Sequence, residues 1–159
     1  MDSSSLNTEW ILWYHSINDN NWDKNSYKEL ISIKNLYDYK FLSEEITNEH
    51  LKNTMFFIMR KNIFPTWEDP DNRNGYCISY RINSSNILKC WNDIFLECIT
   101  ENIHLNLSDY NELTGISITP KKEFNILKLW FRDNTKHNLI KSYEPYIIKS
   151  NCMIKKHDI

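Results

Sequence analysis

Residues 63–75 read Ile63-Phe64-Pro65-Thr66-Trp67-Glu68-Asp69-Pro70-Asp71-Asn72-Arg73-Asn74-Gly75, and they are the most distinctive segment of the chain. Trp67 stands here among polar and turn-forming residues. Tryptophan is usually buried, so an indole in such a segment either folds back onto the core or stacks on a flat ligand. Trp22, within residues 18–25, lies in a second polar loop of the same kind. Two such indoles, one followed directly by the carboxylate of Glu68, favour a stacking site.

The bulk properties predict one domain and limit its functions. A chain of 159 residues is large enough for a hydrophobic core. Its net charge of −2 excludes a generally basic protein that coats nucleic acid, so any phosphate contact must come from a local basic spot. We expect residues 1–8 to form a short flexible tail before a single domain at 9–159.

The remaining composition predicts a monomeric cytoplasmic protein without a metal or a cofactor. No apolar run is long enough to span a membrane, and the N-terminus lacks the layout of a signal peptide. The four cysteines form no Cys-x-x-Cys pair and are expected to be reduced thiols. Alanine, valine and glutamine are absent, which indicates an AT-rich genome, such as that of a parasite or a large DNA virus. The two glycines, Gly75 and Gly115, are each expected where the backbone tolerates no side chain.

Hydrophobic patterning predicts an α+β fold. Strands are expected at 9–14, 55–59, 76–82, 115–118 and 125–131, with another around Met153 and a strand or turn-rich piece at 27–33. Helices are expected at 36–46, at 86–103 with Ser85 as N-cap, and within 139–148. This order lacks regular βαβ alternation, so an antiparallel sheet with helices on one face fits best.

The other tryptophans divide between core and surface in this pattern. Trp10 and Trp13 lie in the apolar first strand and Trp91 on the apolar stripe of the long helix, so all three are expected in the core. In the strand at 125–131, Leu127 and Leu129 face one way, whereas Ile126, Lys128 and Trp130 face the other. The lysine predicts that this second face is open to solvent, with Trp130 as a third accessible indole.

Trp22 and Trp67 facing each other would form a slot for a flat ring, and indole faces favour a ring that carries positive charge. Glu68 could accept hydrogen bonds from two adjacent N–H groups, a pair that guanine offers along one edge. Guanine methylated at N7 is cationic and stacks better than guanine itself. Phosphates would meet three lysines near Trp130: Lys121, Lys122 and Lys128. Together these residues predict a reader of methylated guanosine with a phosphate tail, such as the cap of messenger RNA.

At these residues the chain resembles the eukaryotic translation initiation factor 4E family of cap-binding proteins. Pro-x-Trp-Glu-Asp followed by Asn-x-x-Gly is the most specific match, and the resemblance runs collinearly over about residues 9–131. The other matching stretches are 10–14, the Trp22 loop, 91–101 and 115–130. The resemblance implies a curved antiparallel sheet of about eight strands backed on its convex face by three helices, with the cap on the concave face.

The resemblance also implies roles for single residues. Trp22 and Trp67 are similar to the two stacking walls, and Glu68 to the carboxylate that reads the guanine edge. Trp130 resembles the residue that contacts the N7-methyl group. Lys121 falls where the family has a phosphate-binding arginine, an exchange that keeps charge but loses bidentate geometry.

Several positions depart from the family. A family phosphate lysine aligns with Ile126, so Lys122 or Lys128 would have to supply that contact, and Tyr76 and Cys77 replace a glycine and a basic residue. The implied partner is a scaffold protein of the initiation factor 4F type or a regulatory 4E-binding protein. It would dock on the convex face at Leu36, Lys40, Asn92, Asp93 and Leu96. Lys40 replaces the family tryptophan and Asn92 a leucine.

Four functions therefore stay open. The leading hypothesis is a non-enzymatic cap-binding protein in translation initiation. A repressor or decoy would hold caps without recruiting the scaffold. An enzyme that processes nucleotides or caps is the alternative from another class, although no acidic metal site or Ser-His-acid set is evident in the sequence. The last is an interaction module whose cap pocket has decayed.

Overall fold

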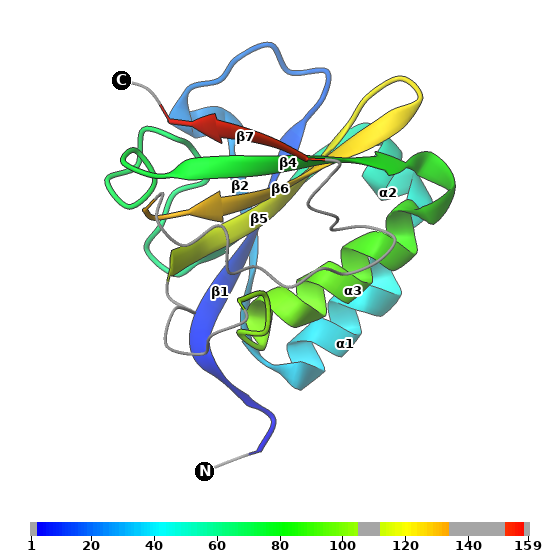
Figure 1. Ribbon diagram of the computed structural model, residues 1–159. Helices are drawn as coiled ribbons and strands as arrows, with labels where there is room; N and C mark the ends of the chain where they lie inside the picture. The colour runs from blue at the N-terminus through cyan, green and yellow to red at the C-terminus, as the bar shows by residue number, and fades with distance from the viewer. Residues whose placement is uncertain (1–2, 105–111, 134–151, 158–159) are drawn as a thin grey trace.

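The computed structural model describes residues 3–104, 112–133 and 152–157, which form a seven-stranded antiparallel sheet (Figure 1). In the described chain the spatial order of strands is β2-β1-β3-β5-β6-β4-β7. The strands are β1 (Ser5–Ser16), β2 (Lys28–Asn35), β3 (Thr54–Arg60), β4 (Tyr76–Asn83), β5 (Leu113–Pro120), β6 (Phe124–Phe131) and β7 (Cys152–Lys156). The expected α+β class with a curved antiparallel sheet is confirmed, with seven strands in these residues where about eight were expected.

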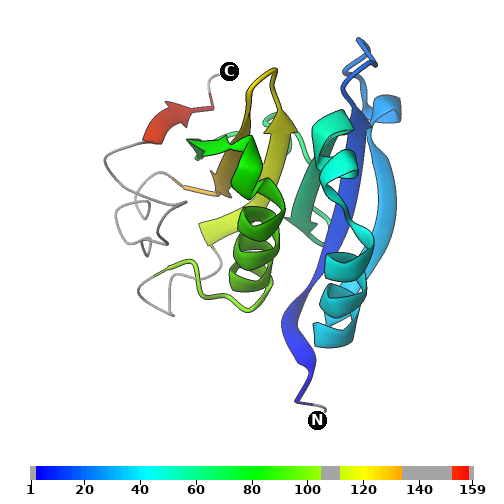
Figure 2. The same ribbon diagram turned by 90° about the vertical axis from the view of Figure 1, so that its right-hand side faces the viewer.

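Three α-helices cover one face of this sheet (Figure 2): α1 (Leu36–Glu45), α2 (Asn48–Asn53) and α3 (Ile87–Ile99). Asn35 caps α1, because its side chain accepts a hydrogen bond from the Asp38 N–H at 3.0 Å. The helix expected within 139–148 lies outside the described residues. None of the described helices is long and apolar enough to cross a membrane.

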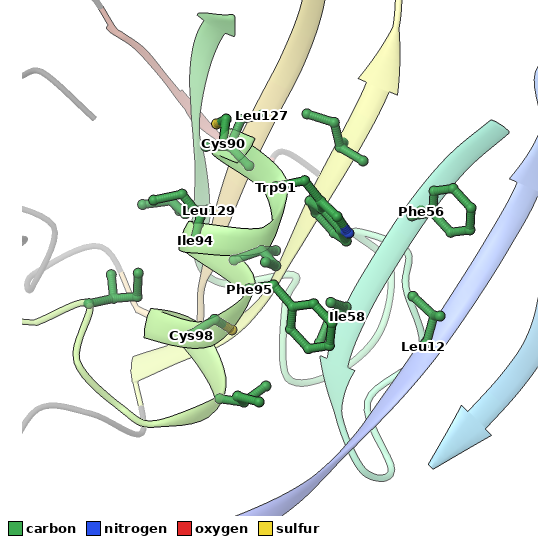
Figure 3. Packing of buried hydrophobic residues seen from close by; sticks show 14 of the residues in the cluster. Leu12, Phe56, Ile58, Cys90, Trp91, Ile94, Phe95, Cys98, Leu127 and Leu129 are labelled. Atoms are coloured by element: carbon green, nitrogen blue, oxygen red, sulfur yellow. The ribbon is translucent and has the colours of Figure 1, made fainter. Parts of the chain in front are cut away.

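Side chains on the helix-covered face of the sheet form the main core together with α3 (Figure 3). Leu127 and Leu129 point into it from β6 and are fully buried, as the alternation predicts. From α3, Trp91 and Phe95 enter the same core on the side of Phe56 and Ile58, and both are 0% exposed. Trp10 of β1 is also fully buried in this core, as expected. Burying a large aromatic side chain stabilises the fold by about 1.5–3 kcal/mol.

Three boundaries differ from the sequence expectations. β1 begins at Ser5 and pairs with β2, so residues 5–8 belong to the sheet and not to a tail. Ser85 is not the N-cap of α3; Asn83 caps a short 3₁₀ turn (Ser84–Asn86) that leads into the helix.

The C-terminus of α3 also differs, because the helix ends at Ile99 and not at Ile103. Glu101 adopts φ 65°, the Glu101 N–H bonds to the Cys98 carbonyl, and the Asn102 N–H bonds to the Glu97 carbonyl. This Schellman arrangement stops a helix. Glycine usually takes the left-handed position; here a buried bidentate ion pair with Arg60 holds Glu101 there.

Both glycines stand where strands pack too closely for a side chain. A Cβ at Gly75 would lie 1.6 Å from the Phe131 carbonyl oxygen, and one at Gly115 would lie 2.5 Å from the Ile58 carbonyl oxygen. Gly75 therefore lets the chain just before β4 pass close to the backbone at the end of β6.

The helix-free face carries a smaller buried cluster of five residues: Phe57, Met59, Ile63, Cys77 and Trp130. Trp13 and Tyr27 pack against it from the β1 side and are half-buried. Trp13 thus joins this second cluster instead of the main core that was expected for it. The candidate site lies on the same face.

Candidate functional site

The six tryptophans separate into two exposed indoles and four covered ones. Trp22 is 54% exposed and Trp67 is 38% exposed. Both lie in loops, at 17–27 and 61–75, as the sequence predicts. An exposed indole forgoes much of the free energy that burial of its surface would provide, so two exposed indoles on one small domain need an explanation other than folding.

The loop at 17–27 presents Trp22 on a histidine. The rings of His15 and Trp22 are stacked, with centroids 3.9 Å apart and planes inclined by 3°. His15 is fully buried, and its Nε2 lies 2.9 Å from the Asn21 carbonyl oxygen and 3.1 Å from Ser26 Oγ. The histidine therefore supports one face of the indole and ties down both ends of the loop segment that carries it.

The loop at 61–75 is held in shape by Asp69 and Asn72, two of the three polar residues of the most specific motif. The Asp69 carboxylate accepts hydrogen bonds from the backbone N–H groups of Phe64 and Asp71, each at 2.9 Å. The buried Asn72 side chain donates to the Thr66 carbonyl at 2.9 Å and accepts from Thr114 Oγ1 at 2.6 Å. These bonds fix the turn and leave the side chains of Trp67 and Glu68 exposed.

The two loops begin at opposite ends of the sheet. They come together because the 61–75 loop folds back across the helix-free face. Ser16 at the end of β1 pairs with the first residue of β3, whereas the 61–75 loop follows the last residue of β3. Phe64 then returns across the helix-free face, where its ring contacts Trp13 at 5.0 Å and Tyr27 at 5.4 Å between centroids. Tyr27 in turn lies 6.2 Å from Trp22. A row of neighbouring aromatic rings therefore links the two loops.

The pKa values of Tyr27 and His157 indicate that Glu68 lies near these aromatic rings. Burial raises the pKa of Tyr27 to about 12, and the Glu68 carboxylate adds to that increase. Burial lowers the pKa of His157, while Glu68 opposes the change. The Glu68 carboxylate is therefore close enough to both Tyr27 and His157 to affect their pKa values.

Trp130 corrects a sequence expectation, because it is buried and not an accessible indole. It is only 7% exposed, and its Nε1–H donates to Ser117 Oγ at 3.0 Å. Ile63 from the fold-back loop packs against it, and the His157 ring lies 5.4 Å away. The strand alternation assigned its face correctly, but residues remote in sequence cover that face.

A cavity of about 880 Å³ opens on the helix-free face beside Trp22. Of the basic residues predicted to meet phosphates, Lys121 and Lys128 line it, whereas Lys122 does not. Arg81 and Lys155 also line it and were not predicted. A signal for Arg81 was present, since it alternates with the core residues of β4, but β7 was too short to give a face to Lys155. Trp67, Glu68 and Trp130 do not line the wall of this cavity.

Cys77 and His157 form a close pair next to Trp130. Nδ1 of His157 lies 2.7 Å from the Asn72 carbonyl, which can only accept, so Nδ1 carries the proton and Nε2 accepts from the Cys77 thiol at 3.0 Å. Burial raises the pKa of Cys77 to about 12, so the pair supplies no reactive thiolate. The described residues contain no group of three or more His, Cys, Asp or Glu placed to hold a metal.

The residues predicted for partner binding lie on α1 and α3, which the Tyr39 hydroxyl joins by donating to the Asn92 carbonyl at 2.8 Å. Leu36 and Lys40 are exposed on α1, whereas Asn92, Asp93 and Leu96 are half-buried on α3. The Asp93 carboxylate pairs with Lys89 at 2.7 Å. Tyr37 and Phe41, which the sequence did not single out, are among the most exposed apolar side chains described.

Comparison with known proteins agrees with this architecture. Among solved structures, eIF4E-3 of C. elegans in complex with the 4E-binding protein Mextli and a cap analog superimposes with a TM-score of 0.75 at 19% identity, covering 86% of this chain and 78% of that one. Ascaris suum eIF4E-3 with m7G cap gives a TM-score of 0.74 at 18% identity, covering 86% and 77%. These likenesses concern the fold.

Sequence relatives come from a virus and from yeasts. A eukaryotic translation initiation factor 4E homolog of Acanthamoeba polyphaga mimivirus is 24% identical over 135 residues, covering 72% of this chain and 50% of the relative. Initiation factor 4E of Saccharomyces cerevisiae is 24% identical over 143 residues, covering 86% and 65%. The chain thus spans about half to two thirds of the curated relatives it matches. The family model described as Eukaryotic initiation factor 4E matches residues 5–150, so the chain belongs to the eukaryotic initiation factor 4E family.

Proposed function

We propose that this protein binds the 7-methylguanosine cap of messenger RNA and acts in translation initiation in the cytoplasm as a non-enzymatic, monomeric binding protein. The observation that carries the proposal is the separation of the tryptophans: four are covered, while Trp22 and Trp67 remain exposed in two loops that fold toward each other. Family membership supports the same conclusion.

The methylated base would stack between Trp22 and Trp67. His15 covers one face of Trp22, so the ligand ring would use the opposite face. A cationic ring gains from the negative faces of two indoles, and each base–aromatic stack contributes about 1–3 kcal/mol. Unmethylated guanine lacks the positive charge and would bind more weakly.

Glu68 would read the guanine edge by accepting its two adjacent N–H groups, and the Trp67 backbone N–H would donate to the guanine carbonyl. The exposure of the Glu68 side chain supports this role. Hydrogen bonds of Asp69 and Asn72 hold the turn, so the Glu68 carboxylate is not needed for that purpose. Trp130 would contact the N7-methyl group through the small part of its ring that is exposed. Lys121 and Lys128 would meet the phosphates from the cavity wall, which Lys122 does not line.

Fluorescence titration with 7-methylguanosine triphosphate tests the proposal. We expect strong quenching in the wild type, a loss of binding in Trp67→Ala, and partial recovery in Trp67→Phe, which keeps an aromatic face. GTP should compete poorly. Equal affinity for GTP and its methylated form would contradict the proposal, and an absence of quenching would favour a decayed pocket. Hydrolysis of capped RNA on long incubation with magnesium would instead favour the enzyme.

A second candidate function, a cap-binding repressor or decoy, is favoured by the exposed cation at Lys40. The convex surface would bind a scaffold protein of the initiation factor 4F type or a regulatory 4E-binding protein through the predicted residues on α1 and α3. Exposed Leu36, Tyr37 and Phe41 support a protein-binding role for this surface. A pull-down with scaffold peptide should be weak for wild type and stronger for Lys40→Trp if the protein is a decoy. Strong binding by the wild type would favour an initiation factor.

A further inference from the structure

We propose that Arg81, Lys128 and Lys155 form a polyphosphate-binding subsite across β4, β6 and β7, so that the C-terminal strand supplies part of the ligand site. The ligand class is the triphosphate bridge of a nucleotide. The identity of that nucleotide rests on the proposed function, whereas the anion subsite can be tested without it.

The register of the strands places the three cations on one face. Lys155 of β7 pairs with Cys77 of β4, and Lys128 of β6 pairs with Ser79. Arg81 follows two residues further along β4. Successive side chains of a strand alternate between faces, so Cys77, Ser79 and Arg81 share the helix-free face with their partners. The three cations therefore lie on one face of three adjacent strands, within the span of β4 from Cys77 to Arg81.

The cavity on this face is basic, although the whole chain is acidic. Arg81, Lys121, Lys128 and Lys155 line it, and no aspartate or glutamate of the described chain does so. None of these four cations forms an ion pair with a carboxylate of the described residues. Four positive charges around one hollow in a protein of net charge −2 raise the local concentration of anions.

Electrostatic effects on neighbouring groups support the proximity of two of these lysines. Lys128 and Lys155 both lower the pKa of the Cys77 thiol, against the larger effect of burial. The same two lysines lower the pKa of His157. Both lysines are therefore close to the same two side chains, in agreement with the strand order, in which β6 and β7 flank β4.

Arg81 is held by an aromatic ring. Its guanidinium carbon lies 3.8 Å from the centroid of Phe124, which also lines the cavity. A stacked guanidinium keeps its N–H groups around its rim, where phosphate oxygens can accept them in pairs. Arg81 also lies directly opposite Ile126 in the sheet. The positive charge that β6 lacks at Ile126 is therefore present on the neighbouring strand.

The subsite and Trp22 line the same cavity, so one ligand can reach both. A base stacked on Trp22 would direct its phosphates along the cavity toward β4, β6 and β7. β7 is an edge strand that pairs with β4, and in this arrangement its contribution to function is Lys155.

Two neighbouring lysines of β7 give a matched test. Lys155→Gln removes a cation from the cavity, whereas Lys156→Gln removes one from the opposite face, where Lys156 pairs with Tyr76. Calorimetric titration of the folded full chain with inorganic tripolyphosphate should show wild-type binding weakened about 3- to 10-fold by Lys155→Gln, and changed less than about 2-fold by Lys156→Gln. Arg81→Gln should weaken it similarly, and raising the salt concentration should reduce the difference.

Equal effects of Lys155→Gln and Lys156→Gln, or no binding of tripolyphosphate by the wild type, would overturn the subsite.

Titrations with nucleotide ligands distinguish a failure of the subsite from a failure of the proposed function. Lys155→Gln should weaken the binding of 7-methylguanosine triphosphate and leave the binding of 7-methylguanosine unchanged. A wild type that binds tripolyphosphate but not 7-methylguanosine would refute the cap proposal and keep the subsite. An uncapped RNA with a 5′-hydroxyl should bind wild type and Lys155→Gln alike; an equal loss with this RNA would assign the cluster to backbone phosphates and overturn the triphosphate assignment.

Discussion

The two faces of the sheet use aromatic residues in opposite ways. On the helix-covered face, Trp10, Trp91 and Phe95 are fully buried in one continuous core with three helices. On the other face a small cluster around Trp130 lies beside loops in which Trp22 and Trp67 remain exposed. The first face holds the fold together, and the second leaves apolar surface and positive charge accessible. Stability and ligand binding should therefore respond to different substitutions.

Trp91→Ala should give the largest effect and should act on stability. It removes a fully buried indole from the centre of the main core, and such truncations cost about 3–5 kcal/mol. Urea denaturation measures the free energy of unfolding. The control is Trp67→Ala, which should change it by less than about 1 kcal/mol because the indole is exposed. Equal losses in both variants would remove the distinction between the faces.

Trp22→Ala should act on binding instead. Loss of one stacking wall should weaken the binding of 7-methylguanosine triphosphate by about 1–3 kcal/mol, which lowers the affinity by a factor of about 5 to 150. Fluorescence titration measures this effect through the remaining tryptophans. Tyr37→Ala, which removes an exposed aromatic from α1 on the helix-covered side, should leave the affinity unchanged.

His15→Ala should weaken the binding of the same ligand to a smaller extent, by about 0.5–1.5 kcal/mol, because it removes the ring that supports Trp22. His15→Phe should recover much of the affinity, since it restores an aromatic surface without the contacts to Asn21 and Ser26. The titration should be paired with quenching by acrylamide, which reports the mobility of Trp22. Unchanged affinity in His15→Ala would show that the indole is held by its loop alone.

The smallest effect concerns pH and the end of β7. Burial lowers the pKa of His157 from its ordinary value of 6.5, so on acidification the unfolded chain takes up its proton first. The contribution of this group to stability is present above pH 6.5 and is lost as the pH falls below it. His157→Gln should reduce the loss of stability between pH 7.5 and 5.5, measured by urea denaturation. A steeper loss in the variant would contradict this assignment.

Much of the fold could be predicted from local patterns. Alternation in β4 and β6 assigned the buried faces, and helical spacing identified α1 and α3, because one-sided burial imposes a period of 2 or 3.6 on a sequence. The exact end of α3 could not be predicted. It depends on the ion pair between Glu101 and Arg60, which joins residues 41 positions apart.

The candidate site was only partly visible in the sequence. The exposed state of Trp22 and Trp67 followed from their polar, turn-forming neighbours. The burial of Trp130 did not, since Ile63 and His157 reach it from other segments. Lys155 was missed for the same reason: only pairing with β4 determines which face of β7 it occupies.

The sequence by itself determined the α+β class, the two loop tryptophans and the close-packed glycines, because each depends on the chemistry of adjacent residues. The tertiary structure alone decided which groups meet: Phe64 with Tyr27, Trp22 with His15, and the cations of β4, β6 and β7 around one cavity. The physical reason is that strand register and loop fold-back bring together residues far apart in the chain, and no local pattern records the distance between them.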